Sequence, residues 1–284
     1  MENFIWKISH LIPYLDETVD TDRIYIHQCL ASTNDTAKVM AKEDCPHGTV
    51  VIADKQTAGR GRFNRNFYSP EGTGLYMSVI LDADKLCLDE FTLLTPLVAV
   101  IASRVIHNCT GKKCGIKWVN DLYLGDKKIC GILTEGVMIG NSISKIVVGI
   151  GINIATSEFP EEISGIAGAL VSEDDEIVVD GLEVNLEQGK KISNFELKSN
   201  LAASLINELV KEQAFKDASD IMEEYREKQI LIDKTVTVFD AKESYVARVL
   251  GVDCNGCLQV ERVDGELAGQ IEILNSGEVS LKRI

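Results

Sequence analysis

The stretch GTVVIADKQTAGRGRFNRNFYSPEGTGLYMSVILD, residues 48–82, has two apolar segments that flank a loop rich in glycine and arginine. GTVVIAD (48–54) predicts a buried strand leading into the loop, and GLYMSVILD (74–82) predicts the strand that leaves it. Between them, Arg60, Arg62 and Arg65 stand beside two glycines, which let the backbone approach another molecule closely. Guanidinium groups held there can bind an anion or a flat polar group. The stretch therefore predicts two strands of a sheet joined by half of a binding site.

The rest of the chain up to residue 232 mixes strands and helices, without the strict alternation of a doubly wound parallel sheet. Further strands are expected at 24–26, 114–119, 128–135 and 145–154, and helices at 30–43, 89–111, 196–212 and 217–229. Ser32, with Asp35 three residues on, marks the start of the first helix, and Gly111 marks the end of the second. We expect an α+β domain whose mostly antiparallel sheet has helices packed against it.

A second domain is expected after residue 232. Five short alternating segments separated by turn residues follow, which in so short a span predicts a small closed barrel. The chain would then divide into domains 1–232 and 233–284. Residues 157–194 are acidic and dotted with glycine, and we expect them to form a peripheral, solvated excursion.

Charge and composition exclude several functions. The chain has 284 residues and a formal net charge of −15, so its global field repels a nucleic-acid backbone. The N-terminus lacks a signal-peptide pattern, and we expect no apolar segment of membrane-spanning length, so the predicted location is the cytoplasm. Eight cysteines at irregular positions indicate free thiols, and Cys254 and Cys257 flank an Asn-Gly turn. Residues 1–22 are too few for a helix-turn-helix domain.

Five short motifs carry the candidate chemistry, and each also has an ordinary structural explanation. They are STN (32–34), QTAGRGR (56–62), KWVND (117–121), KKICGIL (127–133) and GIGIN (149–153). STN can be explained as a helix cap and QTAGRGR as a surface loop. KWVND can be explained by a turn at Asn120-Asp121, and KKICGIL by a lysine that reaches solvent. GIGIN lacks the third glycine of a dinucleotide motif, and its glycines indicate a strand face on which something flat packs. No nucleophilic elbow or histidine cluster is present, which favours chemistry based on positive charge and a magnesium nucleotide.

Together and in this order, the five motifs resemble those of the biotin protein ligases over roughly residues 24–284. The resemblance implies a catalytic domain like that of class II aminoacyl-tRNA synthetases and a small SH3-like barrel, in a monofunctional enzyme without an N-terminal DNA-binding domain. It implies that biotin and ATP give biotinyl-adenylate, and that a lysine of a biotin carboxyl carrier domain then receives the biotinyl group. Magnesium would arrive with the phosphates, without a dedicated protein metal site.

The resemblance also implies roles for individual residues. Catalytic roles fall to Lys128, Arg60 and Asp121; biotin binding to Ser32, Thr33, Asn34, Gln56, Arg60, Gly61, Arg62, Lys128 and Gly131; and ATP binding to Arg62, Phe67, Asn120, Asp121 and Asn153. Ser32, Thr33 and Gln56 would bind the ureido head, and Lys128 the carboxylate and α-phosphate. This chain departs from the family pattern at Val119, where proline is usual, and at Phe67, where tryptophan is common.

Other functions remain open at this point. A lipoate or octanoate ligase or transferase shares the fold, but those enzymes lack the GRGR segment. A non-catalytic biotin-binding regulator would not need Lys128 and Arg60, which are present. Nucleic-acid binding through the arginine loop conflicts with the charge balance. The sequence leaves open whether the protein is a monomer or a homodimer.

Overall fold

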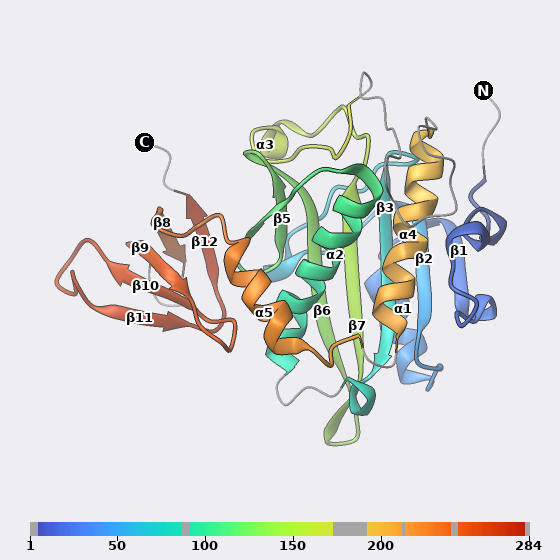
Figure 1. The fold of residues 1–284 in the computed structure, drawn as a ribbon, viewed down its shortest axis with the longest axis horizontal. Coiled ribbons are helices and arrows are strands. Elements are labelled where there is room, and N and C mark those ends of the chain that lie inside the picture. Colours follow the sequence, from blue (N-terminus) through green and yellow to red (C-terminus); the bar gives the residue numbers. More distant parts are fainter. Residues whose placement is uncertain (1–4, 87–90, 173–191, 212–213, 240–243, 282–284) are drawn as a thin grey trace.

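A seven-stranded sheet forms the centre of the computed structural model, which describes residues 5–86, 91–172, 192–211, 214–239 and 244–281 (Figure 1). In spatial order the strands are β1 (Ile24–Leu30), β2 (Thr49–Gln56), β3 (Gly74–Asp82), β7 (Ser142–Asn153), β6 (Lys127–Ile139), β5 (Asp121–Leu124) and β4 (Gly115–Lys117). Among these strands β1 and β2 pair in parallel, and the other five pairings are antiparallel. The predicted mostly antiparallel sheet is confirmed, although β5 was not predicted.

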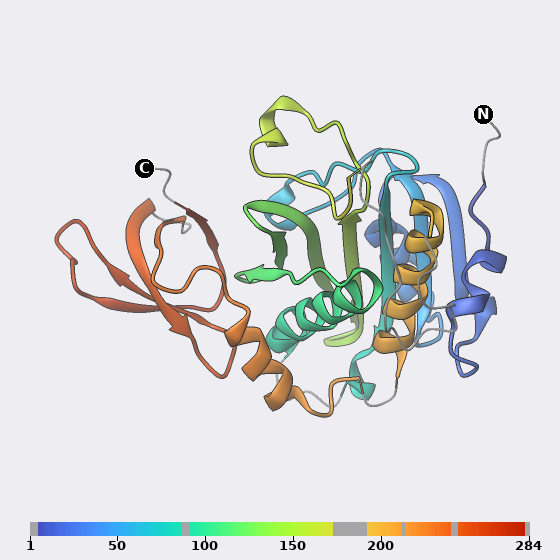
Figure 2. The same ribbon diagram turned by 45° about the horizontal axis from the view of Figure 1, so that its top comes forward.

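Helices cover both faces of this sheet (Figures 1 and 2). The described helices are α1 (Thr33–Lys42), α2 (Leu94–Thr110), α3 (Glu161–Ser164), α4 (Asn194–Val210) and α5 (Ala218–Glu227); α1 packs on one face of the sheet, and α2 and α4 pack on the other. Because alternate residues of a strand point to opposite faces, Val51 joins Ala37 of α1 in one small core, whereas Val50 belongs to the larger core with α2 and α4. Helices pack on both sides of the sheet because its strands carry apolar side chains on both faces.

Helix α2 is the most apolar helix of the described chain. With the turn before it, residues Phe91–Thr110 are long and apolar enough to cross a membrane by length and composition alone, at a mean hydropathy of 1.4. The expectation that no segment reaches this length is therefore wrong. The helix nevertheless packs against α4, α5 and β6, and 61% of its most apolar window is buried, so it is a core helix. It ends as predicted at Gly111, whose φ of 69° is left-handed.

Short 3₁₀ turns complete the larger unit: Ile8–His10, Ile12–Tyr14, Thr21–Arg23, Arg62–Asn64, Ala83–Lys85 and Phe91–Leu93. The N-terminal turns lie beside α4, where the Trp6 Nε1–H donates to Ser199 Oγ at 3.1 Å and Leu11 is fully buried. The N-terminal segment is thus part of the core of this unit.

The C-terminal residues form a second, five-stranded antiparallel sheet of order β11-β10-β9-β8-β12. Its strands are β8 (Thr235–Phe239), β9 (Ser244–Val252), β10 (Leu258–Arg262), β11 (Ile271–Leu274) and β12 (Glu278–Leu281). Within the described residues, β11 and β12 each pair on one side only, so the sheet is open and the expected closed SH3-like barrel is not seen. The alternation of apolar residues predicts each strand. It does not determine whether the two four-residue edge strands, β11 and β12, pair with each other and close the barrel.

Candidate active site

One pocket of about 280 Å³ gathers the motifs that the sequence spreads along the chain. It lies over the middle of the large sheet, where Met77 of β3, Ile132 of β6 and Ile150 of β7 line it. Every residue predicted to act in catalysis or in binding biotin or ATP lines this pocket: Ser32, Thr33, Asn34, Gln56, Arg60, Gly61, Arg62, Phe67, Asn120, Asp121, Lys128, Gly131 and Asn153. The pairing of β3, β7 and β6 brings these segments together; the individual roles stay predictions.

One end of the pocket is formed by the helix cap and Gln56. Ser32 Oγ caps α1 by accepting the backbone N–H of Asp35 at 3.4 Å. Gln56 Oε1 accepts the N–H and hydroxyl of Thr33 at 2.8 and 3.2 Å, and its Nε2 donates to Ser69 Oγ at 2.9 Å. This end therefore offers closely spaced neutral donors and acceptors, which suit a small polar head group.

Asn34 lines the same wall but makes its hydrogen bonds within the protein. Its Oδ1 accepts the Ser78 hydroxyl at 2.6 Å, and its Nδ2 donates to Glu135 Oε2 at 2.9 Å and to Leu133 O at 3.3 Å. Because both amide hydrogens are used and only 4% of the residue is exposed, the geometry favours a role in fixing α1 against β6.

Glycines of β6 and β7 leave room for side chains from elsewhere in the chain. A Cβ added to Gly149 would lie 2.0 Å from Asn34 Oδ1, and one added to Gly151 would lie 2.6 Å from Phe67 Cε1. At Gly131 the corresponding distance to Phe67 Cε2 is 3.2 Å. The Phe67 ring thus lies on the bare backbone where the sequence indicated a flat ligand.

The other end of the pocket is cationic. Lys128 Nζ lies 2.7 Å from Asp121 Oδ1, and that buried oxygen has no other hydrogen-bond partner among the described residues. Arg62 donates to Asn120 Oδ1 at 3.3 Å and to the carbonyl of Gly277 at 3.2 Å. In a chain of net charge −15, these fixed cations make a local site for anions.

Lys117 belongs to the same cationic end, although the sequence assigned it no role. Its side chain lines the pocket, and burial lowers the pKa of its ammonium group while Asp121 acts in the opposite direction. A desolvated lysine gains more from an anionic ligand than an exposed one does. Its place before the strand end in KWVND was the signal that could have identified it.

The segment after β7 corrects the expectation of a solvated excursion at 157–194. Phe159, Ile163 and Ile166 line the pocket, and Lys128 N donates to Ile166 O at 2.8 Å. In the sequence, the acidic residues of this segment drew attention away from these three apolar residues, which form one wall of the pocket. Residues 173–191 of the predicted excursion lie outside the described residues.

The C-terminal sheet closes one side of the pocket, which the sequence did not predict. Residues 277–280 line it, and Arg65 forms an ion pair with Glu278 at 2.6 Å. The Trp118 Nε1–H of the KWVND motif donates to Gly256 O at 2.9 Å in the turn flanked by Cys254 and Cys257. Contacts between residues far apart in sequence thus complete the site.

The donor set suits anionic, phosphate-bearing ligands. Among the described residues, no group of three or more His, Cys, Asp or Glu side chains is arranged to hold a metal ion. A magnesium ion held by phosphates could be met by the carboxylate of Asp121. Polar hydrogen-bonding groups at one end and cations at the other would place a ligand's head group and its carboxylate separately.

Several known proteins are similar to this chain in sequence. Residues 26–153 match the Biotin/lipoate A/B protein ligase family. The chain is 42% identical over 146 residues to the Bifunctional ligase/repressor BirA of Bacillus subtilis, covering 51% of this chain and 45% of that protein. It is 32% identical over 111 residues to the Biotin--[acetyl-CoA-carboxylase] ligase of Paracoccus denitrificans, covering 37% and 44%. The matches span less than half of each of these relatives.

A solved structure resembles the chain over more of its length. The biotin protein ligase of Aquifex aeolicus in complex with biotin and ATP is 25% identical, with a TM-score of 0.66, and the match covers 92% of this chain and 99% of that one. The similarity therefore includes the large sheet and the C-terminal sheet.

Proposed function

We propose that this chain is an ATP-dependent biotin protein ligase of the biotin/lipoate A/B protein ligase family, a proposal supported by the family match over residues 26–153 and by the similarity to curated and solved biotin ligases. In the first step, a carboxylate oxygen of biotin attacks the α-phosphorus of ATP, the bond to the β-phosphate breaks, and biotinyl-adenylate and pyrophosphate form. In the second, a lysine amine attacks the acyl carbon, and AMP and a proton leave. Such chemistry depends on positioning and charge stabilisation.

The observation that carries the proposal is the placement of two unlike groups in one pocket. Ser32, Thr33 and Gln56 lie at the neutral polar end, and Lys128 and Arg62 lie at the cationic end. The first set would bind the ureido head of biotin, and a ureido group left unpaired there would cost about 1–3 kcal/mol. The second set would neutralise the carboxylate and phosphate oxygens as they approach each other.

Lys128 is the residue on which both steps would depend. Asp121 holds its ammonium group at 2.7 Å, so the charge is already placed before the negative oxygens meet. Asp121 would also orient the incoming acceptor lysine. Phe67, Asn120 and Asn153 would line the nucleotide, while Arg60 and Arg62 would bind carboxylate and phosphate oxygens, with magnesium supplied together with ATP.

The acceptor we propose is the carrier domain of a biotin-dependent carboxylase, in the cytoplasm. A net charge of −15 supports the absence of a nucleic-acid partner. We keep 1–232 and 233–284 as proposed domains, the first carrying the chemistry and the second closing the pocket through residues 277–280.

The test is exchange of labelled pyrophosphate into ATP by the purified protein with magnesium and biotin. Exchange is expected with biotin and not with lipoate or octanoate, and Lys128→Ala is expected to reduce it about 100-fold or more. Lys211→Ala serves as the control, since Lys211 is exposed and pairs only with Glu208 among the described residues. Biotin binding without exchange would indicate a non-catalytic binder, and absence of biotin binding would refute the proposal.

A further inference from the structure

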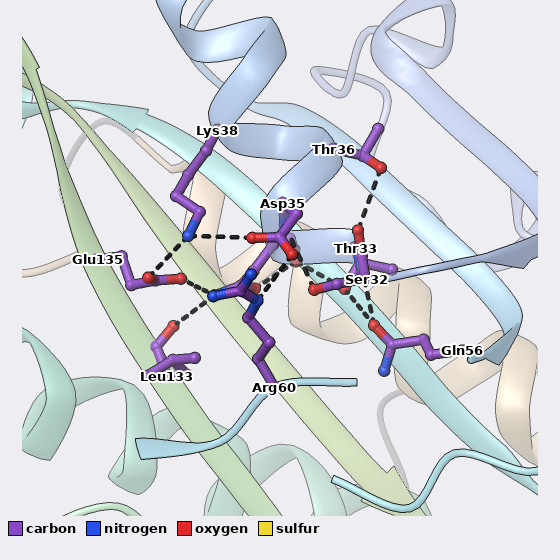
Figure 3. A network of polar contacts seen from close by, with 11 residues as sticks. Ser32, Thr33, Asp35, Thr36, Lys38, Gln56, Arg60, Leu133 and Glu135 are labelled. Atoms are coloured by element: carbon purple, nitrogen blue, oxygen red, sulfur yellow. Dashed lines mark hydrogen bonds and ion pairs between the residues drawn. The ribbon is translucent and has the colours of Figure 1, made fainter. Parts of the chain in front are cut away.

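A row of charged side chains runs behind the arginine loop (Figure 3). Arg60 Nε lies 2.7 Å from Asp35 Oδ2, and Asp35 Oδ1 lies 3.1 Å from Lys38 Nζ. Lys38 Nζ in turn lies 2.9 Å from Glu135 Oε1 on β6. Only Arg60 among these four lines the pocket. The other three do not line it, and the Asp35 carboxylate reaches the pocket through its contact with Arg60.

We infer that Asp35 is a positioning residue that holds the Arg60 guanidinium at the pocket, an inference that rests on the proposed function. The Arg60 side chain is 51% exposed, and a long exposed side chain without a partner loses entropy when a ligand orders it. Asp35 removes part of that entropic cost, because it already holds the Arg60 side chain before a ligand binds. A guanidinium has five N–H donors, so contact through Nε leaves donors for a ligand oxygen.

The helix explains why Asp35 is a rigid anchor. Asp35 lies in the first turn of α1, where a carboxylate is stabilised by the helix dipole, and its backbone N–H is tied to the Ser32 cap. Lys38, one turn further on, fixes the other carboxylate oxygen. Because Lys38 is also tied to Glu135, the anchor is connected to β6 of the main sheet.

Backbone bonds hold the rest of the loop but leave the Arg60 side chain to Asp35. Gly61 N donates to Arg65 O at 2.7 Å, and Phe67 N donates to Gly59 O at 2.9 Å, which fixes the internal shape of the loop. Among the described residues, Asp35 is the only acid paired with Arg60. Loss of Asp35 should therefore free the side chain without unfolding the loop.

The test combines variants Asp35→Asn, Asp35→Glu, Arg60→Gln and the double variant Asp35→Asn/Arg60→Gln. Glu208→Gln is the control, because Glu208 at the end of α4 forms a similarly spaced surface pair with Lys211, the residue that follows the helix. Michaelis constants for biotin and ATP, and the turnover number, are measured by pyrophosphate exchange. Trypsin cleavage after Arg60 is measured in parallel on the ligand-free protein.

Asp35→Asn is expected to raise the Michaelis constants about two- to fivefold, with a smaller change in turnover, and to speed trypsin cleavage after Arg60. Asp35→Glu should restore part of both, and Glu208→Gln should change neither. In the Arg60→Gln background, Asp35→Asn should add nothing. An equal effect of Asp35→Asn with and without Arg60 would overturn the inference in favour of a helix-capping role, as would unchanged constants and cleavage. If the wild type shows no exchange, the proposed function fails, while the cleavage assay still decides whether Asp35 holds Arg60.

Discussion

Gly149 tests how tightly the pocket wall is packed. In Gly149→Ala, the new Cβ would lie 2.0 Å from Asn34 Oδ1, so the buried Asn34 side chain must move. Moving it breaks the hydrogen bonds to Ser78 at 2.6 Å and to Glu135 at 2.9 Å. With about 1 kcal/mol for each bond and about 1 kcal/mol or more for overpacking, we expect the free energy of unfolding to fall by about 2–4 kcal/mol.

The assay is urea denaturation followed by circular dichroism, with Gly251→Ala as the matched control. Gly251 also lies in a strand, but a Cβ there would meet nothing within 4 Å, so its stability should change by less than about 0.5 kcal/mol. Asn34→Ala removes the clashing amide, and in that background Gly149→Ala should cost about 1 kcal/mol or less. Equal costs in both backgrounds, or no cost in the wild type, would refute the proposed clash.

Two further predictions concern the pocket floor and the thiols. Gly151→Ala should displace the Phe67 ring, because the new Cβ would lie 2.6 Å from Phe67 Cε1. The fractional loss of the pyrophosphate-exchange rate should exceed the fractional loss of the free energy of unfolding. Exchange rates and urea midpoints measured on one preparation check this. Burial raises the pKa of the Cys130 thiol, so little thiolate forms near neutral pH, and iodoacetamide should label exposed Cys254 in the native protein but Cys130 only after unfolding. The alkylated peptides are quantified by mass spectrometry, and equal reaction rates of Cys254 and Cys130 without denaturant would contradict this prediction.

Local patterns predicted the parts of the fold that depend on neighbours in the chain. The strand at 74–82 has its predicted bounds, and the first helix begins after Ser32 as its cap indicated. Strand pairing across long loops is not a local property, so β5 and the open edges of the C-terminal sheet were missed. The apolar wall at 159–167 was missed because acidic neighbours dominate the composition of that region.

The same limit applies to the site, where a residue's type was predictable but its partner was not. The glycines of GIGIN indicated a close approach, yet only the fold shows that Asn34 and Phe67 make it. The same holds for Asp35: the sequence explains it as part of a helix start, and in the structure only its backbone N–H takes part in the cap. Its carboxylate is left for Arg60, 2.7 Å away on a loop whose position depends on the pairing of β2 with β3. A complete local explanation of a residue can therefore leave its functional atoms unassigned.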